Sequence, residues 1–311
     1  MVSILIPVYN REGLIEETVQ SAINQTYKDI EIIIVDNKST DTTWDVLTRL
    51  ATEDDRIRIF QNTENIGPVK NWMRCINEAS GEYGKILWSD DLISPTFIEK
   101  TLPYLEKNDD VGFVFTGAEI FYDSSTKKID THFIGKTGFY KSESFILGIL
   151  SNKGYPVSPG CAIFRLKDLS KNLLIDIPNK VGSSFSMHAI GNDLLIFLLT
   201  ANAYDKFGFI NKKLSYFRAH AGSISIKSND GKLPLHYNLS IAYFVENFRN
   251  NLIEKLNTNI FFTIKRFPKG SIKYRLNSIE AYYINNKNYH MDLLHLIKKF
   301  FLIKRIVKFF F

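Results

Sequence analysis

Short, almost continuously apolar segments alternate with segments of helical periodicity over the first 117 residues. The apolar segments are rich in β-branched residues and end at turn-forming residues, which predicts buried strands. The intervening segments carry apolar residues on one face, which predicts amphipathic helices. The predicted strands are 2–8, 30–35, 56–60, 85–88 and 111–117, and the predicted helices are 12–24, 42–52, 67–79 and 95–106. This α/β alternation is typical of a Rossmann-like, mostly parallel sheet with helices on both faces.

The rest of the chain is less regular and then becomes helical. Strands are predicted at 160–165, 207–210 and 214–218, and a helix at 193–202. From Leu233 onward the periodicity is helical, with aromatic and basic residues mixed. We therefore expect a catalytic domain over 1–226, divided into 1–117 and 118–226, and a helical, basic C-terminal region over 227–311.

Composition and charge support this division. The chain has 311 residues, of which 45% are hydrophobic and 23% charged, and this composition excludes a disordered chain. Its net charge is +6, but residues 250–311 carry twelve basic and three acidic side chains, so the body is mildly acidic. Two cysteines, Cys75 and Cys161, exclude a disulfide framework and fit a cytoplasmic setting. No apolar run reaches eighteen residues and no secretory signal pattern opens the chain, so a transmembrane helix is not expected.

Several common kinds of site are excluded by spacing. No two glycines stand two positions apart, so the dinucleotide-binding fingerprint is absent. The chain also has no P-loop, no G-x-S-x-G elbow and no H-E-x-x-H motif. Oxidoreductases, P-loop ATPases, α/β-hydrolases and zincins are therefore disfavoured.

Carboxylates at strand ends are the remaining candidates for chemistry. Asp36 follows one predicted strand, and Asp90 and Asp91 follow another. In parallel sheets, ligands bind beyond the carboxyl ends of the strands. A carboxylate there can accept a hydrogen bond from a nucleobase or a ribose, and two adjacent ones can hold Mg²⁺ or Mn²⁺ against a diphosphate. Each aspartate taken alone is equally compatible with an ordinary turn.

Six segments occur in one order along the chain. They are Ser3–Arg11, Gln25–Tyr27, Glu31–Asp41, Asn65–Pro68 with Asn71, Ala79–Tyr83, and Ser89–Asp91. In this order the segments resemble the donor-binding half of the family 2 glycosyltransferases, which have a GT-A fold, and the resemblance covers about residues 2–225.

The resemblance implies roles for individual residues. Pro7 and Tyr9 would lie beside the nucleobase, and Asp36 would accept its ring N–H. Asp90 would face the ribose, and Asp91 would hold a divalent metal, Mn²⁺ or Mg²⁺.

Other positions complete or depart from the family's pattern. Asn71 falls within the nucleotide-binding segments. The family often has a second Asp where Asn37 stands and frequently an Asp where Trp88 stands.

Two segments of the second half extend the resemblance. Asp193 matches the family's catalytic base, with Asn192 in place of the usual acidic neighbour; read without the family, Asp193 is a helix N-cap. The segment Leu214–Ser225 resembles the family's closing motif, in which Arg218 or His220 would contact the diphosphate.

The sequence is therefore interpreted as a metal-dependent, inverting hexosyl- or deoxyhexosyltransferase. It would use a nucleoside-diphosphate sugar, UDP- or dTDP-linked, and a lipid-linked saccharide acceptor in bacterial surface polysaccharide synthesis, such as O-antigen or capsule. The basic tail from His290 to Phe311 would place it peripherally on the inner face of the plasma membrane, with no nucleic acid partner. A sugar nucleotidyltransferase and a non-catalytic glycan- or nucleic-acid-binding protein remain alternatives.

Overall fold

The computed structural model describes residues 1–220 and 230–300. Ser223 and Ser225 of the closing motif, and Arg305 and Lys308 of the tail, lie outside the described residues. The chain forms two compact units, each described here by itself. The first comprises Met1–Asp176 with Ser184–Ile226, and the second Ile177–Ser183 with Lys227–Phe311.

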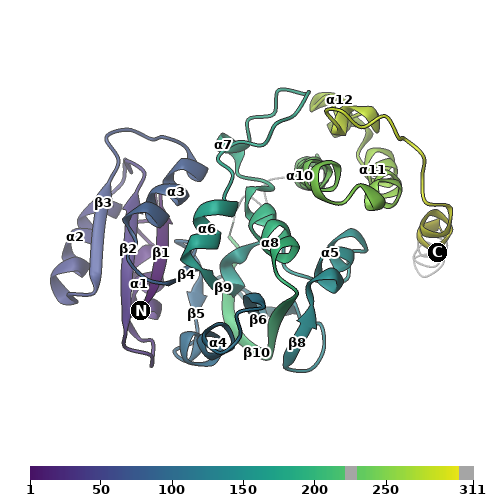
Figure 1. The fold of residues 1–311 in the computed structure, drawn as a ribbon. Helices are drawn as coiled ribbons and strands as arrows, with labels where there is room; N and C mark the ends of the chain where they lie inside the picture. Colours follow the sequence, from purple (N-terminus) through teal and green to yellow (C-terminus); the bar gives the residue numbers. More distant parts are fainter. Residues whose placement is uncertain (221–229, 301–311) are drawn as a thin grey trace. The chain divides into compact units, whose positions relative to one another are not determined.

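One large sheet runs through the first unit in the order β3-β2-β1-β4-β9-β6-β10-β5 (Figure 1). Its first four strands pair in parallel, as the alternating sequence pattern predicts. They are β1 (Val2–Val8), β2 (Ile30–Asp36), β3 (Ile57–Gln61) and β4 (Tyr83–Ile86). Because these strands run the same way, their carboxyl ends share one edge of the sheet, where the predicted site residues lie.

The other half of the sheet is mixed rather than mostly parallel. Strand β9 is antiparallel to both β4 and β6, whereas β10 is parallel to β6. The two strands predicted at 207–210 and 214–218 are one strand, β10, with an irregular register against β6. The strands are β5 (Leu92–Ile93), β6 (Val111–Tyr122), β7 (Ser125–Thr131), β8 (Gly138–Lys141), β9 (Ala162–Arg165) and β10 (Lys206–Arg218).

Helices cover both faces of the parallel half. Side chains alternate along a strand, and Ile4 and Ile6 of β1 share a core cluster with Val19 and Leu47 of α1 and α2. Helix α3 also packs on β1 and β2, but its buried residues lie outside that cluster, which places it on the opposite face. The helices of the first unit are α1 (Ile15–Ile23), α2 (Thr43–Glu53), α3 (Pro68–Glu78), α4 (Phe97–Glu106), α5 (Ser142–Leu150), α6 (Leu166–Asn172), α7 (Phe185–His188) and α8 (Asn192–Ala203), with the 3-10 turn η1 (Pro159–Cys161).

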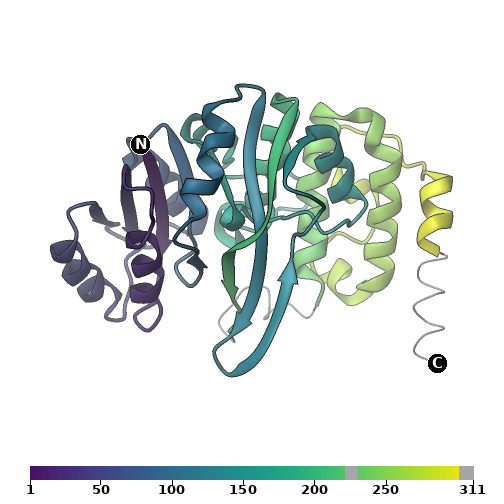
Figure 2. The ribbon, with the colours of Figure 1, turned by 90° about the horizontal axis from the view of Figure 1, so that it is seen from below.

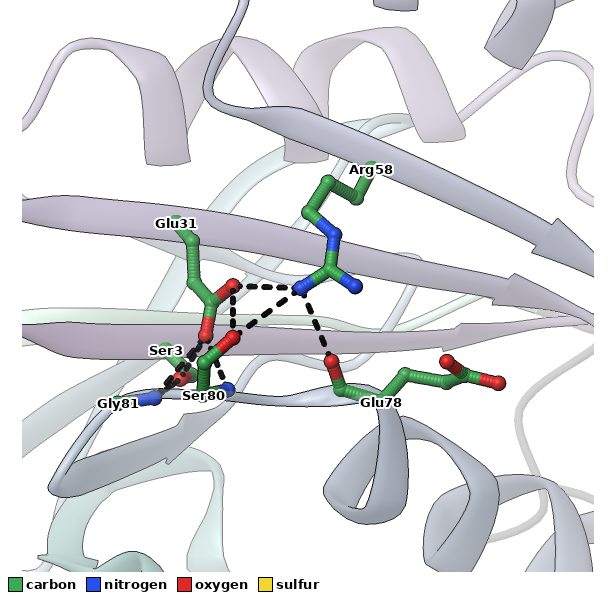
Figure 3. Close-up of polar contacts among 6 residues, drawn as sticks. All are labelled: Ser3, Glu31, Arg58, Glu78, Ser80 and Gly81. Carbon is green, nitrogen blue, oxygen red and sulfur yellow. Dashed lines mark hydrogen bonds and ion pairs between the residues drawn. The ribbon is translucent and has the colours of Figure 1, made fainter.

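A buried carboxylate holds the opposite, amino-terminal edge of the sheet together (Figure 3). Glu31 of β2 accepts hydrogen bonds from the Ser3 hydroxyl at 2.6 Å and from the Ser80 and Gly81 amides at 2.6 and 3.1 Å. Arg58 of β3 donates to the second oxygen at 2.9 Å. A Cβ on Gly81 would stand 2.5 Å from the Ser3 hydroxyl, so this approach requires glycine. The α3–β4 connection is thereby fastened to β1, β2 and β3.

The second unit is helical, as predicted. Helices α10 and α11 pack against each other, and the segment after η3 returns to α11, where Asn257 donates to the Asn288 and His290 carbonyls at 2.9 and 2.8 Å. Its elements are α10 (Lys232–Phe248), η2 (Asn250–Leu252), α11 (Ile253–Arg266), α12 (Pro268–Lys273) and η3 (Glu280–Tyr282), followed by a helix over 293–300 (Figure 2). Across 1–220 and 230–300, no helix combines the length and apolar character needed to cross a membrane.

Candidate active site

The loops after β1 and β2 are joined at the carboxyl edge of the sheet. The Asn37 amide donates to the Val8 carbonyl at 2.9 Å, which continues the strand pairing by one residue. Asn10, in the left-handed region with φ 50°, donates its amide to the Ser39 hydroxyl and accepts the Thr40 amide through its side chain at 2.8 Å. Asparagine tolerates this backbone conformation better than most residues. The two loops therefore form one rigid rim.

Asp36 is an anchor inside this rim. Its side chain is fully buried, and its oxygens accept the Ser39 amide at 3.2 Å and the Gln61 side-chain amide at 2.9 Å. A nucleobase N–H that donated to Asp36 would share its oxygens with Ser39 and Gln61. Pro7 is buried within β1, whereas Tyr9 is 40% exposed and is the accessible member of the predicted nucleobase set.

Asn71 belongs to a network of asparagines beneath the same rim. Its side-chain amide donates to the Val35 carbonyl at 3.0 Å, and its oxygen accepts from Asn62 at 2.8 Å. Asn62 also donates to Asn37 at 2.9 Å, and Asn37 in turn donates to Asn65. Asparagine at position 37 supplies both a donor and an acceptor to this network, which a carboxylate cannot. Asn71 thus fixes the end of β2 through its hydrogen bond to Val35.

Asp90 and Asp91 lie between β4 and β5 and have different surroundings. Asp91 is almost fully buried and accepts the Arg218 amide at 2.9 Å. Burial, together with the neighbouring Asp90 carboxylate, raises the pKa of Asp91 well above its ordinary value. Asp90 Oδ2 lies 2.9 Å from His220 Nε2 and 3.6 Å from Arg11 Nη2. The structure therefore brings Asp90, Asp91, Arg218 and His220 together.

The Arg218 side chain is already engaged by carboxylates. It forms ion pairs with Glu17 of α1 and Asp123, and its Nε donates to the Asp90 carbonyl at 3.0 Å. Its guanidinium also lies 4.8 Å from the centre of the Phe121 ring. Because two carboxylates neutralise it, Arg218 acts here as a clamp that fixes the acidic turn. Of the two predicted diphosphate contacts, His220 is the one whose ring faces Asp90.

Arg11 is a cation of this site that the sequence analysis did not single out. Its Nη1 donates to the Asn10 carbonyl at 3.0 Å, and its buried Nε has no hydrogen-bond partner. Its position directly after the Asn10 turn is the signal that could have identified it. Arg11 and His220 approach the Asp90 carboxylate from the loop after β1 and the end of β10.

Asp193 lies in the first turn of α8. Its Oδ1 accepts the Gly191 and Leu194 amides at 3.0 and 2.9 Å, and the helix dipole favours an anion there. Asn192 donates to the Leu174 carbonyl at 2.7 Å and to the Ile175 carbonyl at 3.3 Å. A carboxylate at position 192 would face two carbonyl oxygens with no proton to donate, which explains the departure from the acidic pair.

The donor chemistry of the site fits a hard divalent cation. Within the described ranges, no group of three or more His, Cys, Asp or Glu side chains has the arrangement of a metal centre. Two adjacent carboxylates and an imidazole are nevertheless ligands that Mn²⁺ accepts. Burial and then the neighbouring Asp90 carboxylate raise the pKa of Asp91, and a cation bound there would offset both effects.

A Rossmann-like sheet with an acidic pair at its carboxyl edge defines a GT-A nucleotide-sugar-binding fold. The glycosyl transferase family 2 profile matches residues 3–173, more than half of the chain, so the chain belongs to this family. An uncharacterised glycosyltransferase of Haemophilus influenzae is 36% identical over 44% of this chain and 42% of its own length. WfaP of Escherichia coli, a UDP-Glc:alpha-D-GlcNAc-diphosphoundecaprenol beta-1,3-glucosyltransferase, is 28% identical over 72% and 80% of the two chains. Staphylococcus aureus TarS 1–349, in a crystal structure with UDP-GlcNAc, superposes with a TM-score of 0.65 at 17% identity, over 87% and 74% of the chains, which shows the shared fold.

The relatives extend beyond the aligned region. The chain spans about half the length of the first curated relatives it matches, two uncharacterised glycosyltransferases of Haemophilus influenzae. The family is therefore established from residues 3–173, and the fold from a superposition over 87% of the chain.

Proposed function

We propose that this protein transfers a hexosyl or deoxyhexosyl group from a nucleoside-diphosphate sugar to a hydroxyl of a lipid-linked saccharide. The observation that carries the proposal is the convergence of Arg11 and His220 on Asp90, beside the buried carboxylate of Asp91. This convergence lies at the sheet edge where the family binds its donor. The acceptor class is supported by WfaP, whose acceptor is a diphosphoundecaprenol-linked sugar. The setting would be bacterial surface polysaccharide synthesis.

The reaction proposed is a single displacement. Asp193 would accept the proton of the acceptor hydroxyl while the hydroxyl oxygen attacks the anomeric carbon. The bond from that carbon to the diphosphate oxygen breaks at the same time, and the configuration inverts. Arg11 and the His220 ring would stabilise the negative charge that develops on the diphosphate. Tyr9, the exposed residue of the rim, would contact the nucleobase, and Asp36 would hold the rim in place.

Asp90 and Asp91 are the residues that would hold the metal. A divalent cation held there would supply positive charge against the departing nucleoside diphosphate. Asp90 is the more accessible of the two carboxylates, while Asp91 also fixes the Arg218 amide. We therefore assign Asp90 to the metal together with Asp91, in place of a contact with the ribose alone.

The second unit would bind an anionic membrane surface. Its helix over 293–300 exposes apolar side chains: Leu293, Leu294 and Ile297 are 68%, 72% and 42% exposed. On its other side, His295 Nε2 lies 3.0 Å from the Asn259 side chain, and Lys299 lies over the Phe262 ring of α11. A helix with its polar side packed and its apolar side exposed, in a region of net charge +9, suits an anionic interface. This would place the enzyme on the inner face of the plasma membrane.

The test is a transfer assay with the purified full-length protein. UDP-, dTDP- and GDP-sugars are each supplied with Mn²⁺ and a prenyl-diphosphate-linked saccharide, and release of nucleoside diphosphate is measured. The expected result is acceptor-dependent release with one donor, and proton NMR of the product showing inversion at the anomeric carbon.

Two other outcomes would overturn the proposal. Formation of a nucleotide sugar and pyrophosphate from a nucleoside triphosphate and a sugar 1-phosphate would identify a nucleotidyltransferase. Glycan or nucleic acid binding with no turnover of any donor would identify a binding protein.

A further inference from the structure

Two tryptophans meet at the carboxyl end of β4, immediately before the acidic pair. Trp88 stands two residues before Asp90, and its ring centre lies 4.7 Å from that of Trp72 on α3, at an interplanar angle of 48°. Both side chains are partly exposed. Neither indole has a role in the chemistry proposed above.

The Trp88 indole is held in one orientation. Its Nε1 donates to the Ser158 hydroxyl at 2.7 Å. Gly160 of η1 lies directly against the ring, because a Cβ there would stand 3.0 Å from both Cδ1 and Nε1. The η1 turn is in turn fixed by Lys85, whose buried ammonium donates to the Gly160 carbonyl at 2.5 Å and to the Ile86 carbonyl at 2.7 Å.

We infer that Trp88, backed by Trp72, is the aromatic wall on which the sugar ring of the donor stacks. The inference rests on the proposed function and names how that site recognises its sugar. Asp90, two residues away, would hold the metal at the diphosphate of the donor, so the sugar beyond the diphosphate would lie within reach of the Trp88 ring.

The chemistry of the two partners is complementary. The face of an indole carries partial negative charge, and the axial C–H groups of a pyranose form an apolar, weakly positive face. A carboxylate at position 88 would instead accept hydrogen bonds from hydroxyl groups. Trp88 thus makes recognition depend on the shape of one face of the sugar. Sugars that carry no axial hydroxyl on that face would be favoured.

The chain offers a clean optical test because its three tryptophans are Trp44, Trp72 and Trp88. In a Trp44→Phe protein, emission excited at 295 nm reports only the pair. UDP-, dTDP- and GDP-sugars are screened with Mn²⁺ by calorimetry, and the nucleoside diphosphate of each is measured as its control. For the nucleotide sugar that binds, we expect a larger change in the Trp72 and Trp88 emission than its nucleoside diphosphate causes.

Affinity gives the second readout. Trp88→Leu, which keeps apolar volume without a ring, should weaken the nucleotide sugar about tenfold and leave the nucleoside diphosphate within twofold. Trp88→Phe should lose less, and Ser158→Ala, which keeps the indole but removes its acceptor, should lie between wild type and Trp88→Leu. The Phe and Ala variants keep the test valid if the Leu variant fails to fold.

Three outcomes would count against stacking of the donor sugar on Trp88. Equal losses for nucleotide sugar and nucleoside diphosphate would place the indole at the nucleotide. Loss of affinity for a free acceptor saccharide alone would assign it to the acceptor. Binding of no nucleotide sugar and no nucleoside diphosphate by the parent protein would refute the proposed function itself.

Discussion

Replacing Glu31 by glutamine tests the anchor at the amino-terminal edge of the sheet. The substitution keeps the shape of the side chain but removes its charge and one acceptor oxygen. The Glu31 Oε1 atom accepts the Ser3 hydroxyl and the Ser80 amide, each at 2.6 Å, and Oε2 accepts from Arg58 at 2.9 Å. The glutamine NH₂ group would face a guanidinium that donates toward it (Figure 3). We expect the first unit to be destabilised.

The magnitude follows from these contacts. Hydrogen bonds to a charged acceptor are worth about 1.5–3 kcal/mol and neutral ones about 0.5–1.5 kcal/mol. Weakening the two short bonds should therefore cost roughly 2 kcal/mol. The Arg58 ion pair adds less than about 1 kcal/mol, because that side chain is 43% exposed and screened by solvent. The expected loss is about 2–3 kcal/mol at pH 7.

The loss should also depend on pH. Burial alone would raise the pKa of Glu31, but hydrogen bonds from Ser3, Ser80 and Arg58 together lower it below its ordinary value. A carboxyl whose pKa is lowered in the folded state contributes stability above its unfolded pKa, about 4.3. That contribution disappears as the pH falls through the folded pKa. The difference between wild type and Glu31→Gln should therefore be constant from pH 6 to 8 and shrink below about pH 4.

Urea unfolding followed by tryptophan fluorescence is the assay, because Trp44, Trp72 and Trp88 all lie in the first unit. The matched control is Glu53→Gln, which removes the charge of a half-exposed carboxylate paired with Arg49 at 2.8 Å. That control should change the free energy of unfolding by less than about 0.5 kcal/mol. If Glu31→Gln cost no more than the control, the anchor role of Glu31 would be refuted.

Three further predictions concern the chemistry and the membrane. Asp91→Asn should lower turnover by orders of magnitude and weaken Mn²⁺-dependent nucleoside diphosphate binding; normal turnover in EDTA-treated buffer would contradict the metal role. Asp193→Asn should leave donor affinity within a few fold while transfer falls about 10²–10⁴-fold; equal losses in both would indicate a helix cap. Removing the residues after Tyr289, or replacing the exposed Leu293 and Leu294 by serine, should release the protein from anionic liposomes at low salt. The control Ile272→Ser changes a residue of α12 that is equally exposed, and it should not release the protein. Equal pelleting of all these proteins would exclude the tail as the anchor, and a change in oligomeric state alone would assign it to self-association.

The parallel half of the sheet was predictable because β1 and β2 are mostly apolar and buried along their whole length. The mixed half was not, because β6, β9 and β10 pair across long separations, and a pattern of alternation does not give direction. Strand β10 was divided in the prediction because Asn211, Lys212 and Lys213 interrupt its apolar run. These three residues are exposed where the register of β10 against β6 shifts, and the strand continues through them. Strand β7 has a single apolar residue, Ile129, and is exposed along almost its whole length, so it carries no alternation signal.

The sequence identified the acidic pair Asp90 and Asp91, but it did not identify most of the residues that surround the pair. Arg218 was identified by its motif, but Glu17 and Asp123, which neutralise it, lie 201 and 95 residues away in sequence. Arg11 and Trp88 carry no strong motif of their own. Their importance follows from tertiary neighbours: Asp90 for the arginine, and Trp72 with Ser158 for the indole.

Strand β4 links the Glu31 anchor at the amino-terminal edge of the sheet to the candidate site at the carboxyl edge. It has four residues, with Ser80 and Gly81 fastened to Glu31 before it and the segment from Trp88 to Asp91 after it. The Leu87 amide continues the pairing to the Leu5 carbonyl at 2.9 Å, so displacement at one end of so short a strand reaches the other. Loosening the Glu31 anchor should therefore weaken donor binding as well as stability. Glu53→Gln, on α2 and outside this path, should leave donor affinity unchanged, and an equal effect of both substitutions would show that β4 does not carry the coupling.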